Sequence, residues 1–597
     1  MNIKLSYNRY VTVALIMLLM GIISHHTPTP YTIMVYMNGS DLESDFGLAT
    51  SDLAEMLESG LHAKNANVLI FTGGAKRWQN DAIPANECVI WQLSNGRINE
   101  LKSLGKVNMG EPETLRNFIV YGKENFPAEK YGLIMWDHGG GSIAGFGHDE
   151  KFNNSSLSLL DMKQAFEGAG LRDEKLEFLG FDACLMATVE MAVLASDYAH
   201  VLIAAEDLEP GEGWDYTFLS ALNGRPRMDG FAMGKVIVDS FIDFFGDDSE
   251  EILTLSVTDL AYVTPIMAAM GALMEAALDE MSEISDQNSF YETFDRIDSG
   301  KSTYNNGGFY GLATRRANTK TFGEGSPRDN YADMVDIGDM ATLMQDLFPV
   351  EAEAVHNALK KAVVYNRHNS DVNLWGLSTF YIYGGKSQGE NSLEIYSGLG
   401  MDDYYTSYLQ KFFAGLKLRT WDDVICEEYV LLMPVNEDVV RIVGLCAHGN
   451  DSMAQFGDEG ISCATEIWPK INGYSVVLFP IATTANARKY AIPAEINNRE
   501  VDIVLSLSDC GWKISGSRNR IENVYQKGLD PILPGDEIAI YYQEYDFSTN
   551  YETWVKGTTF SAPLSLTWEA APEGYTIGKR RVDACTNVTY SCTSTVA

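Results

Sequence analysis

The sequence contains few cysteines and few basic residues for its length. Only eight cysteines occur in 597 residues. They show neither CxxC nor Cys/His spacing of a zinc site, and they are too sparse for a disulfide framework. Lysine and arginine number 44 against 82 aspartates and glutamates, which gives a net charge of −38. This charge excludes nucleic acid and anionic membrane surfaces as expected partners, and it favours basic substrates and divalent cations.

Internal repeats and low-complexity tracts are also absent, and strongly apolar sequence is confined to the amino terminus. The stretch from Val11 to Ile23 follows Lys4 and Arg9 and is too short to span a bilayer comfortably. Residues 1–27 are therefore predicted to be a signal peptide or, alternatively, an uncleaved anchor. No later segment is expected to cross a membrane. The sequence predicts a secreted or extracytoplasmic protein of the cell envelope or periplasm, with a monomer as the default.

The rest of the chain divides into two parts of different character. Over residues 28–421, short apolar runs such as 31–37 and 68–72 alternate with amphipathic segments such as 112–126. This alternation is typical of a doubly wound α/β/α sandwich around a mainly parallel sheet. Over residues 422–597, short apolar runs are separated by Gly, Asn, Asp and Pro, which predicts an all-β, sandwich-like domain.

Two apolar runs of strand length stop at a reactive residue. Residues 131–136 are followed by Asp-His138-Gly139, and residues 176–181 are followed by Asp182-Ala-Cys184. Because the carboxyl ends of parallel strands share one edge of a sheet, we expect the imidazole and the thiol to lie side by side. A lone cysteine or histidine is more often a structural residue, but the joint occurrence at two strand ends favours a reactive pair.

The pair has the chemistry of nucleophilic catalysis. A helix predicted over 185–196 would direct its free backbone amides toward the sulfur of Cys184, and the neighbouring imidazole would further favour the thiolate. His138 can take the thiol proton and donate it to a leaving amine. The N–H groups of Gly139 and Cys184 can bind an oxyanion, and one such donor contributes about 3–4 kcal/mol to lowering the barrier.

The residues around this pair resemble a known family. Trp136-Asp-His-Gly-Gly140 and Phe181-Asp-Ala-Cys-Leu-Met-Ala187 are similar to the two catalytic blocks of the clostripain family of cysteine peptidases. Supporting blocks are Tyr36-Met-Asn-Gly-Ser-Asp-Leu42, Glu209-Pro-Gly-Glu-Gly-Trp214, Val335-Asp-Ile-Gly-Asp339 and Gly376-Leu-Ser-Thr-Phe380. The resemblance covers most of residues 31–420 and implies a caspase-like fold, a His138–Cys184 dyad and cleavage after Arg or Lys.

The resemblance also suggests how a basic side chain is recognised. Asp182, two residues before Cys184, matches the acidic residue at the base of the S1 pocket in such enzymes. A buried carboxylate can pair with a guanidinium in a way that an apolar group cannot. A second acid is expected from the loop after the next strand, with Glu212 as first choice and Asp207 as the alternative. Asp182 could instead cap the following helix.

Activation and cofactors follow from the same resemblance. It implies self-cleavage in the loop after the histidine strand, where Lys151 is the basic candidate, although a solvated loop lysine would look the same. The chemistry requires no cofactor. Calcium is a candidate activator, and the metal site is unknown because the sequence contains no EF-hand-like loop.

The expected partners are proteins or peptides with a basic residue before the cleaved bond. Alternatives are a transpeptidase or ligase using the same dyad, and a catalytically degenerate binding module.

Overall fold

The computed structural model of the chain describes most residues after the predicted leader. The described ranges are 28–246, 249–283, 308–326, 332–383, 389–401, 403–418, 424–436, 438–446, 454–457, 460–463, 467–521, 524–549, 551–570, 576–583 and 588–595. The leader prediction for residues 1–27 lies outside these ranges.

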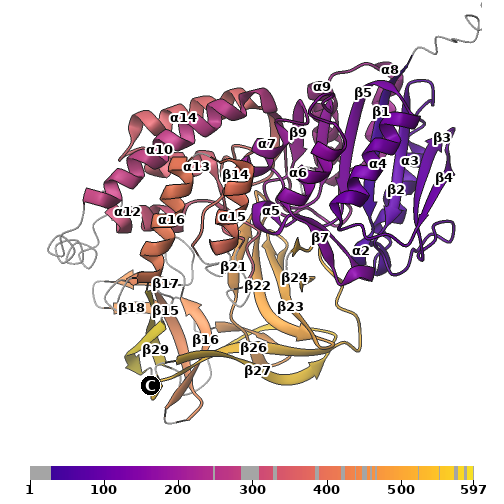
Figure 1. Cartoon of the computed structure of the whole chain (residues 1–597). Helices are drawn as coiled ribbons and strands as arrows, with labels where there is room; N and C mark the ends of the chain where they lie inside the picture. The colour runs from indigo at the N-terminus through magenta and orange to yellow at the C-terminus, as the bar shows by residue number, and fades with distance from the viewer. Residues whose placement is uncertain are drawn as a thin grey trace, which may run out of the picture.

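A nine-stranded sheet forms the centre of the amino-terminal part (Figure 1). Its order is β13-β10-β9-β8-β5-β1-β2-β3-β4. The five central strands are parallel: β9 (Val201–Ala204), β8 (Phe178–Asp182), β5 (Ala128–Trp136), β1 (Thr29–Asn38) and β2 (Ala66–Gly73). The flanking strands are antiparallel: β3 (Cys88–Ser94) and β4 (Arg97–Gly105) at one edge, β10 (Thr254–Asp259) and β13 (Val363–His368) at the other. The predicted parallel arrangement therefore holds for the centre of the sheet and not for its edges.

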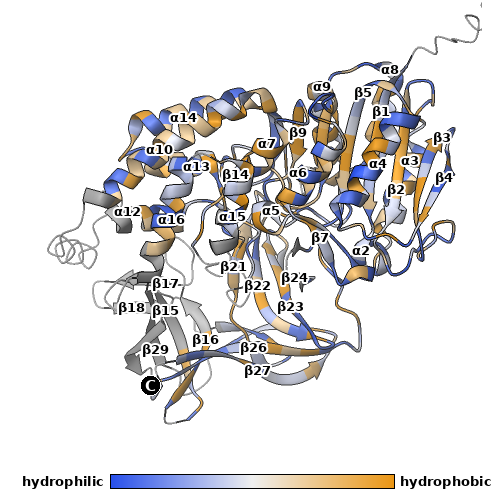
Figure 2. Cartoon of the chain, in the orientation of Figure 1, coloured by the Kyte–Doolittle hydropathy of each residue, from blue (hydrophilic) through white to orange (hydrophobic). Residues whose placement is uncertain are grey.

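Helices cover both faces of this sheet and bury its side chains. In β1, Met34 and Tyr36 face one layer while Ile33 and Val35 face the other, as the two-residue period of a strand requires. The first layer contains α4 (Pro112–Asn125) and α6 (Leu159–Gly168), and the second contains α3 (Leu48–Glu58) and α9 (Gly230–Phe245). Figure 2 shows the central strands as largely apolar ribbons, between helices with a polar outer side. The predicted caspase-like α/β/α sandwich is confirmed.

A helical lobe extends this domain (Figure 1). It contains α10 (Val263–Glu283), α12 (Gly308–Asn318), α13 (Ile337–Met344), α14 (Pro349–Ala362), α15 (Gly389–Leu399) and α16 (Asp403–Leu418), with the small sheet β11 (Thr321–Phe322), β12 (Met334–Asp336) and β14 (Ser378–Phe380). By length and composition alone, Leu260–Met281 could cross a membrane, against the prediction that no segment after the leader would. Its Ile266, Met270 and Leu273 are buried in the core of the lobe.

The carboxyl-terminal part consists of strands. They are β15 (Val424–Pro434), β16 (Val439–Cys446), β17 (Ala454–Gly457), β18 (Gly460–Cys463), β19 (Ile467–Ile471), β20 (Tyr474–Ser475), β21 (Phe479–Thr483), β22 (Ala487–Ile496), β23 (Arg499–Ser508), β24 (Gly511–Ile521), β25 (Val524–Tyr525), β26 (Glu537–Asp546), β27 (Tyr551–Ser561), β28 (Leu566–Ala570), β29 (Thr576–Asp583) and β30 (Val588–Thr595). Ile492, Ile503 and Ile540 lie in its main core. The strands β21 to β24 reach up to the amino-terminal domain beneath α5 and β7 (Figure 1).

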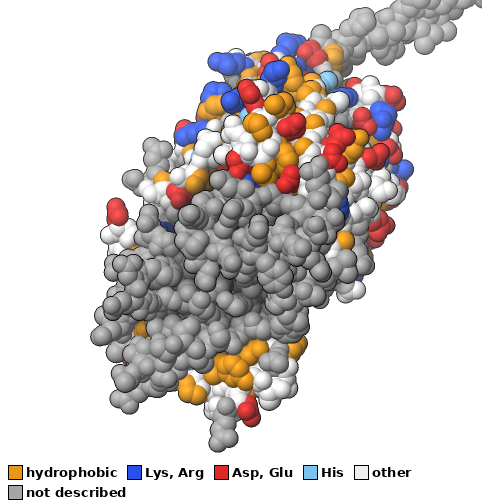
Figure 3. Space-filling model, turned by 90° about the vertical axis from the view of Figure 1, so that its left-hand side faces the viewer, with side chains coloured by type: hydrophobic (Ala, Val, Ile, Leu, Met, Phe, Trp, Pro, Cys, Tyr) orange, Lys and Arg blue, Asp and Glu red, His pale blue; other side chains and the backbone are white. Residues whose placement is uncertain are grey.

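Short elements surround the carboxyl ends of the central strands. They are α2 (Ser40–Ser44), α5 (Gly141–Ala144), β6 (Phe146–Asp149), the 3-10 helix η1 (Glu150–Phe152), β7 (Ser155–Leu157), α7 (Val189–Ala195), η2 (Tyr216–Ser220), α8 (Ala221–Gly224) and η3 (Leu260–Tyr262). On the described part of the face in Figure 3, acidic, basic and apolar side chains are interspersed. A cluster of buried charged groups, Asp182, Glu209 and Lys527, lies near the ends of β5 and β8.

Candidate active site

The two reactive residues meet where β5 and β8 end. Trp136 and Asp182 are partners in the parallel register, so His138 and Cys184 each follow by two residues. Gly139 lies directly against the backbone of Cys184: a Cβ on Gly139 would lie 1.9 Å from the Cys184 carbonyl oxygen and 2.9 Å from its nitrogen. Only glycine fits this approach. The N–H groups of Gly139 and Cys184 have no acceptor among the described residues.

The turn after Cys184 differs from the sequence prediction. A helix was expected from Leu185, but Leu185 has a φ of 63°, and α7 begins only at Val189, where the Thr188 side chain caps it. The left-handed turn stops the helix from starting earlier, so helical amides do not point at the sulfur. Instead, the Glu209 N–H donates to Cys184 Sγ at 3.2 Å. Burial raises the pKa of the Cys184 thiol to about 12, and Glu209 adds to this increase.

The imidazole of His138 is held by groups on both sides. Its Nε2 lies 2.9 Å from Asp41 Oδ1, and its Nδ1 accepts the Lys527 N–H at 2.9 Å. Because a backbone N–H can only donate, Nδ1 carries the lone pair and the proton of the neutral ring lies on Nε2. Although burial opposes it, His138 holds the pKa of the Asp41 carboxyl well below its usual range. Among the described residues, neither ring nitrogen is hydrogen-bonded to Cys184 Sγ.

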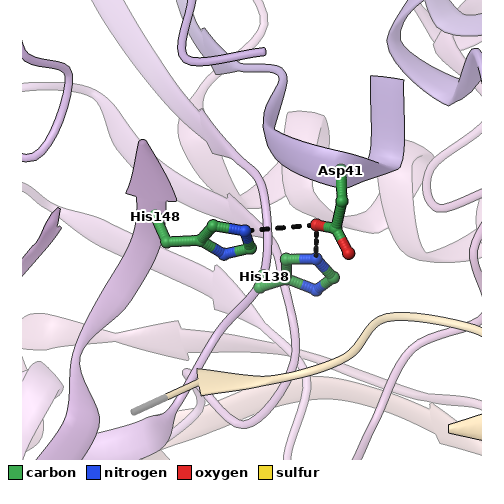
Figure 4. Close-up of side chains that lie close together, drawn as sticks. All are labelled: Asp41, His138 and His148. Carbon is green, nitrogen blue, oxygen red and sulfur yellow. Dashed lines mark hydrogen bonds and ion pairs between the residues drawn. The ribbon is translucent and has the colours of Figure 1, made fainter. Parts of the chain in front are cut away.

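Asp41 also contacts a second histidine, His148 of β6 (Figure 4). His148 Nε2 lies 3.2 Å from Asp41 Oδ1, and its ring stacks on that of His138 with centroids 5.1 Å apart. Burial would lower the pKa of His148, but the hydrogen bond to Asp41 and the charge of Asp137 raise it. One donor atom from each of Asp41, His138 and His148 lies within 4.8 Å of the others. The two rings are nearly parallel, at 8°, and both direct Nε2 at the same Asp41 oxygen.

The turn that carries Asp41 is tied to the histidine strand through Asp137. Asp137 accepts hydrogen bonds from the Asn38 amide at 2.7 Å and from the Ser40 hydroxyl at 2.7 Å. Asp41 lies in the first turn of α2, which has no side-chain cap, and its carboxylate points to His138 (Figure 4). The sequence signal for this contact is the polar block directly after β1, which is the neighbour of β5.

A buried acidic pocket lies beside Cys184. Asp182 is fully buried, and its carboxylate accepts hydrogen bonds from the Tyr216 hydroxyl at 3.0 Å and the Trp214 N–H at 3.3 Å. Lys527 of the carboxyl-terminal domain fills the pocket: its ammonium contacts the Asp182 carboxylate, and its Nζ lies 3.5 Å from Glu209 Oε2. Burial would lower the pKa of Lys527, but Asp182 and Glu209 raise it.

Two further residues complete the walls of the pocket. The Lys527 ammonium lies 5.6 Å from the centre of the Trp136 ring, whose Nε1 donates to the buried Asp52. Burial, reinforced by the charge of Asp182, raises the pKa of Asp52 well above its usual range. Burial also raises the pKa of Glu209 to about 8, against the opposing charge of Lys527. The carboxyl groups of Asp182 and Glu209 therefore contact one ammonium group out of contact with water, and the carboxyl group of Asp52 lies behind the Trp136 ring.

The predicted second acids lie elsewhere. Glu212 is exposed, and the Asp207 carboxylate accepts the backbone N–H groups of Leu208 at 2.8 Å and Gly323 at 3.0 Å. The structure instead brings Glu209, from the same loop as Glu212, together with Asp182 around Lys527. Lys151, the candidate self-cleavage residue, lies in η1, where its Nζ donates to the Ala85 carbonyl at 3.0 Å.

An α/β/α sandwich with a thiol and an imidazole at adjacent strand ends defines a caspase-like cysteine peptidase. The sequence model of the clostripain family matches residues 35–425, and the chain belongs to this family. Clostripain from Hathewaya histolytica is 27% identical over 215 residues, which are 31% of this chain and 40% of clostripain, so the chain spans less than half the length of that relative.

Two solved structures of other chains are similar to part of this chain. A secreted C11 cysteine protease from Bacteroides thetaiotaomicron, bound to an irreversible peptide inhibitor, has a TM-score of 0.45 and 16% identity. An inactive zymogen C11 protease from Parabacteroides distasonis has a TM-score of 0.45 and 20% identity. Each alignment covers 62% of this chain and 99% of the other.

Proposed function

We propose that the protein is a secreted endopeptidase that cleaves after Lys or Arg. Cys184 is the nucleophile, His138 is the general base, and the N–H groups of Gly139 and Cys184 bind the oxyanion. The observation that carries the proposal is the buried acidic pocket beside Cys184, which already holds an ammonium group. An apolar side chain would leave its carboxylates unpaired, so the pocket selects strongly for a basic residue.

The two nitrogens of the His138 ring have different roles in the proposed reaction. With its proton on Nε2 facing Asp41, the ring presents Nδ1 as the base that takes the Cys184 proton. The thiolate attacks the carbonyl carbon of the basic residue, and the developing oxyanion is received by the two unpartnered N–H groups. Nδ1–H then protonates the leaving amine, and water hydrolyses the thioester. Asp41 does not touch the reacting atoms and serves as a positioning residue.

The pocket geometry supports binding of lysine in particular. The Lys527 ammonium donates to the Asp182 carboxylate and to the Asp182 carbonyl oxygen at 3.3 Å, and it pairs by charge with Glu209 Oε2 at 3.5 Å. Gly213 makes room for this group, because a Cβ there would lie 2.3 Å from the Lys527 Nζ. We assign Asp182 and Glu209 as the specificity residues and give Asp207 and Glu212 no contact with the substrate.

Self-processing after Lys151 is part of the proposal. Lys151 lies in η1, which follows β6 directly, and Asn153 and Asn154 after η1 have φ values of 55°, typical of a tight turn. A Lys151→Ala chain should give one uncut band on a denaturing gel where the natural chain gives two. An unchanged cutting pattern would contradict the assignment, and Lys163→Ala, on α6, is the matched control.

The chemistry needs no cofactor, and calcium is proposed only as an activator. Chelation should therefore lower the rate of peptide hydrolysis without abolishing it, and added calcium should restore the rate. Complete loss on chelation would contradict this view.

The central test is replacement of the nucleophile. Cys184→Ala should abolish hydrolysis of fluorogenic peptides that end in Lys or Arg, while Cys510→Ala, at an exposed thiol, should not. Both variants should unfold at the temperature of the natural chain. Peptide cleavage that persists in Cys184→Ala would refute the proposal.

A further inference from the structure

The acidic pocket is occupied by the protein's own carboxyl-terminal domain. After β25, the chain turns through Gln526, Lys527 and Gly528 and enters the space between His138 and the 209–214 loop. In Figure 4 the strand coloured for the carboxyl-terminal region passes beside His138. Lys527 is 1% exposed, and Cys184 and His138 are 0% exposed. A substrate cannot reach the thiol or the imidazole in this arrangement.

The inserted segment is fixed on its own domain. Asp530 and Ser517 of β24 exchange backbone hydrogen bonds of 2.7 and 2.8 Å, and Asn519 Nδ2 donates to Asp530 Oδ2 at 3.0 Å. The Gln526 side chain is buried and bonds to both Asn519 and Asp530. The contacts of Gln526 and Asp530 with β24 therefore fix the conformation of the turn, so little conformational entropy is lost when it enters the pocket.

The peptidase domain fits the segment closely. The Gly528 N–H donates to the Glu209 carbonyl oxygen at 2.9 Å. A Cβ on Gly528 would lie 2.6 Å from the Gly211 nitrogen, and Gly528 has a φ of 74°, so this position requires glycine. Shape, charge and backbone pairing all agree at this contact, as in a specific interface rather than a chance one.

The direction of the segment is opposite to that of a substrate. For cleavage after Lys527, the leaving nitrogen would be that of Gly528, and this nitrogen would have to face His138. The structure has the reverse: the Lys527 nitrogen faces His138 Nδ1, and the Gly528 nitrogen is bonded to Glu209. The lysine side chain thus enters the pocket while the main chain runs the wrong way for proton transfer to the leaving amine.

We propose that the carboxyl-terminal domain is a built-in inhibitor, in which Lys527 blocks the acidic pocket in a reversed orientation that the enzyme cannot cut. The inference rests on the proposed function, since it takes the pocket to be the substrate pocket. It identifies a role for residues 524–530 and for the domain that carries them. Activation then requires this segment to leave the pocket.

A purely structural clamp between the two domains is the alternative. In both cases Lys527→Ala leaves buried carboxylates unpaired and lowers the unfolding temperature. Only the inhibitor predicts that the same change exposes the Cys184 thiol. The matched control is Lys513→Ala, because Lys513 lies on β24 of the same hairpin with a 67% exposed side chain.

The test measures the rate at which an arginyl chloromethyl ketone labels Cys184 in the full-length chain, with an alanyl probe in parallel. The natural chain and Lys513→Ala should label slowly, and Lys527→Ala should label at least about tenfold faster, because the unpaired carboxylates favour opening of the site. Lys527→Met retains the side-chain stem and removes the charge. If Lys527→Ala does not fold, Lys527→Met takes its place with the same expected direction.

The outcomes separate the two proposals. Equal labelling rates in all chains, with Cys184 modified in each, would overturn the inhibitor and leave the peptidase assignment intact. Faster labelling of Lys527→Ala by the alanyl and arginyl probes alike would support the inhibitor and refute the basic specificity. If neither probe labels Cys184 in any chain while iodoacetamide labels it in Lys527→Ala, the peptidase assignment fails. The proposal that the Lys527 segment covers Cys184 would then still hold.

The reversed orientation has its own test. The folded natural chain, with Cys184 intact, is incubated at low concentration, and the products are weighed by mass spectrometry. The bond between Lys527 and Gly528 should stay intact, whereas active Lys527→Ala enzyme should cut the same bond in a denatured Cys184→Ala chain. Cleavage of this bond in the folded natural chain would overturn the reversed orientation.

Discussion

The Lys527 ammonium lies against the Asp182 carboxylate, although the two residues are 345 positions apart in the sequence. Asp182 comes two residues before the thiol, and Lys527 sits on a turn of the carboxyl-terminal domain. A buried ion pair of this kind costs desolvation energy on both sides and is weak evidence for a stabilising role. Its position, in the pocket that we propose to bind a basic substrate side chain, supports a regulatory role instead.

The choice between Glu209 and Glu212 leads to a specificity prediction. Glu209→Gln should lower kcat/KM for lysyl peptides by about tenfold or more, because one of the two carboxyl groups that can pair with the ammonium group is replaced by a neutral amide. Glu212→Gln should have little effect, since its side chain is exposed. Both are measured in the Lys527→Ala background with lysyl and arginyl peptides. A larger effect from Glu212→Gln would show that the pocket is assigned to the wrong acid.

This pair also shows what the sequence could and could not reveal. The strand-end positions of His138 and Cys184 follow from local patterns, in which an apolar run of strand length stops at a polar residue. Glu209 and Glu212 lie in one short loop, and composition does not distinguish them. Which of the two turns inward depends on the backbone path through Gly213, with its φ of 64°.

Other parts of the site depend on contacts between distant segments. The late start of α7 depends on the left-handed turn at Leu185, which an apolar leucine gives no reason to expect. No local sequence pattern predicts that Lys527 lies in the pocket, because this contact depends on the docking of one domain on another. The sequence therefore predicted Asp182 as a member of the acidic pocket, but it did not predict Glu209 or the lysine that fills the pocket.

Asp41 should act by positioning His138. Asp41→Asn should lower kcat by about a hundredfold with little change in KM, because the ring loses the acceptor that keeps its proton on Nε2. Asp41→Glu should recover part of the rate. The matched control is Asp45→Asn, directly after α2, whose side chain lies 3.8 Å from Arg499 and should not affect kcat. A change confined to KM would contradict the positioning role.

Gly139 should tolerate no side chain. Gly139→Ala would bring a Cβ to 1.9 Å from the Cys184 carbonyl oxygen, so the backbone around the thiol must move. We expect activity to fall by at least about a hundredfold, since both oxyanion donors lie in the displaced segments. Gly224→Ala is the control, because nothing lies within 4 Å of a Cβ at that position. Equal activity of the two variants would show that Gly139 is not part of the oxyanion site.

The pH dependence of Cys184 reactivity reports directly on the inserted segment. In the closed structure, burial raises the pKa of the thiol to about 12, so the thiol stays protonated at neutral pH. Iodoacetamide should therefore modify Cys184 slowly, with a rate that rises about tenfold per pH unit between about pH 7 and pH 10. Removal of Lys527 takes away a positive charge that lowers this pKa, but it also admits water, and burial is the larger cause. The labelling rate in Lys527→Ala should then be higher at pH 7 and should reach its plateau at a lower pH than in the natural chain.

Site-specific mass spectrometry measures both profiles, with the exposed Cys510 as internal reference. Superimposable profiles in the two chains would mean that Lys527 does not control access to the thiol.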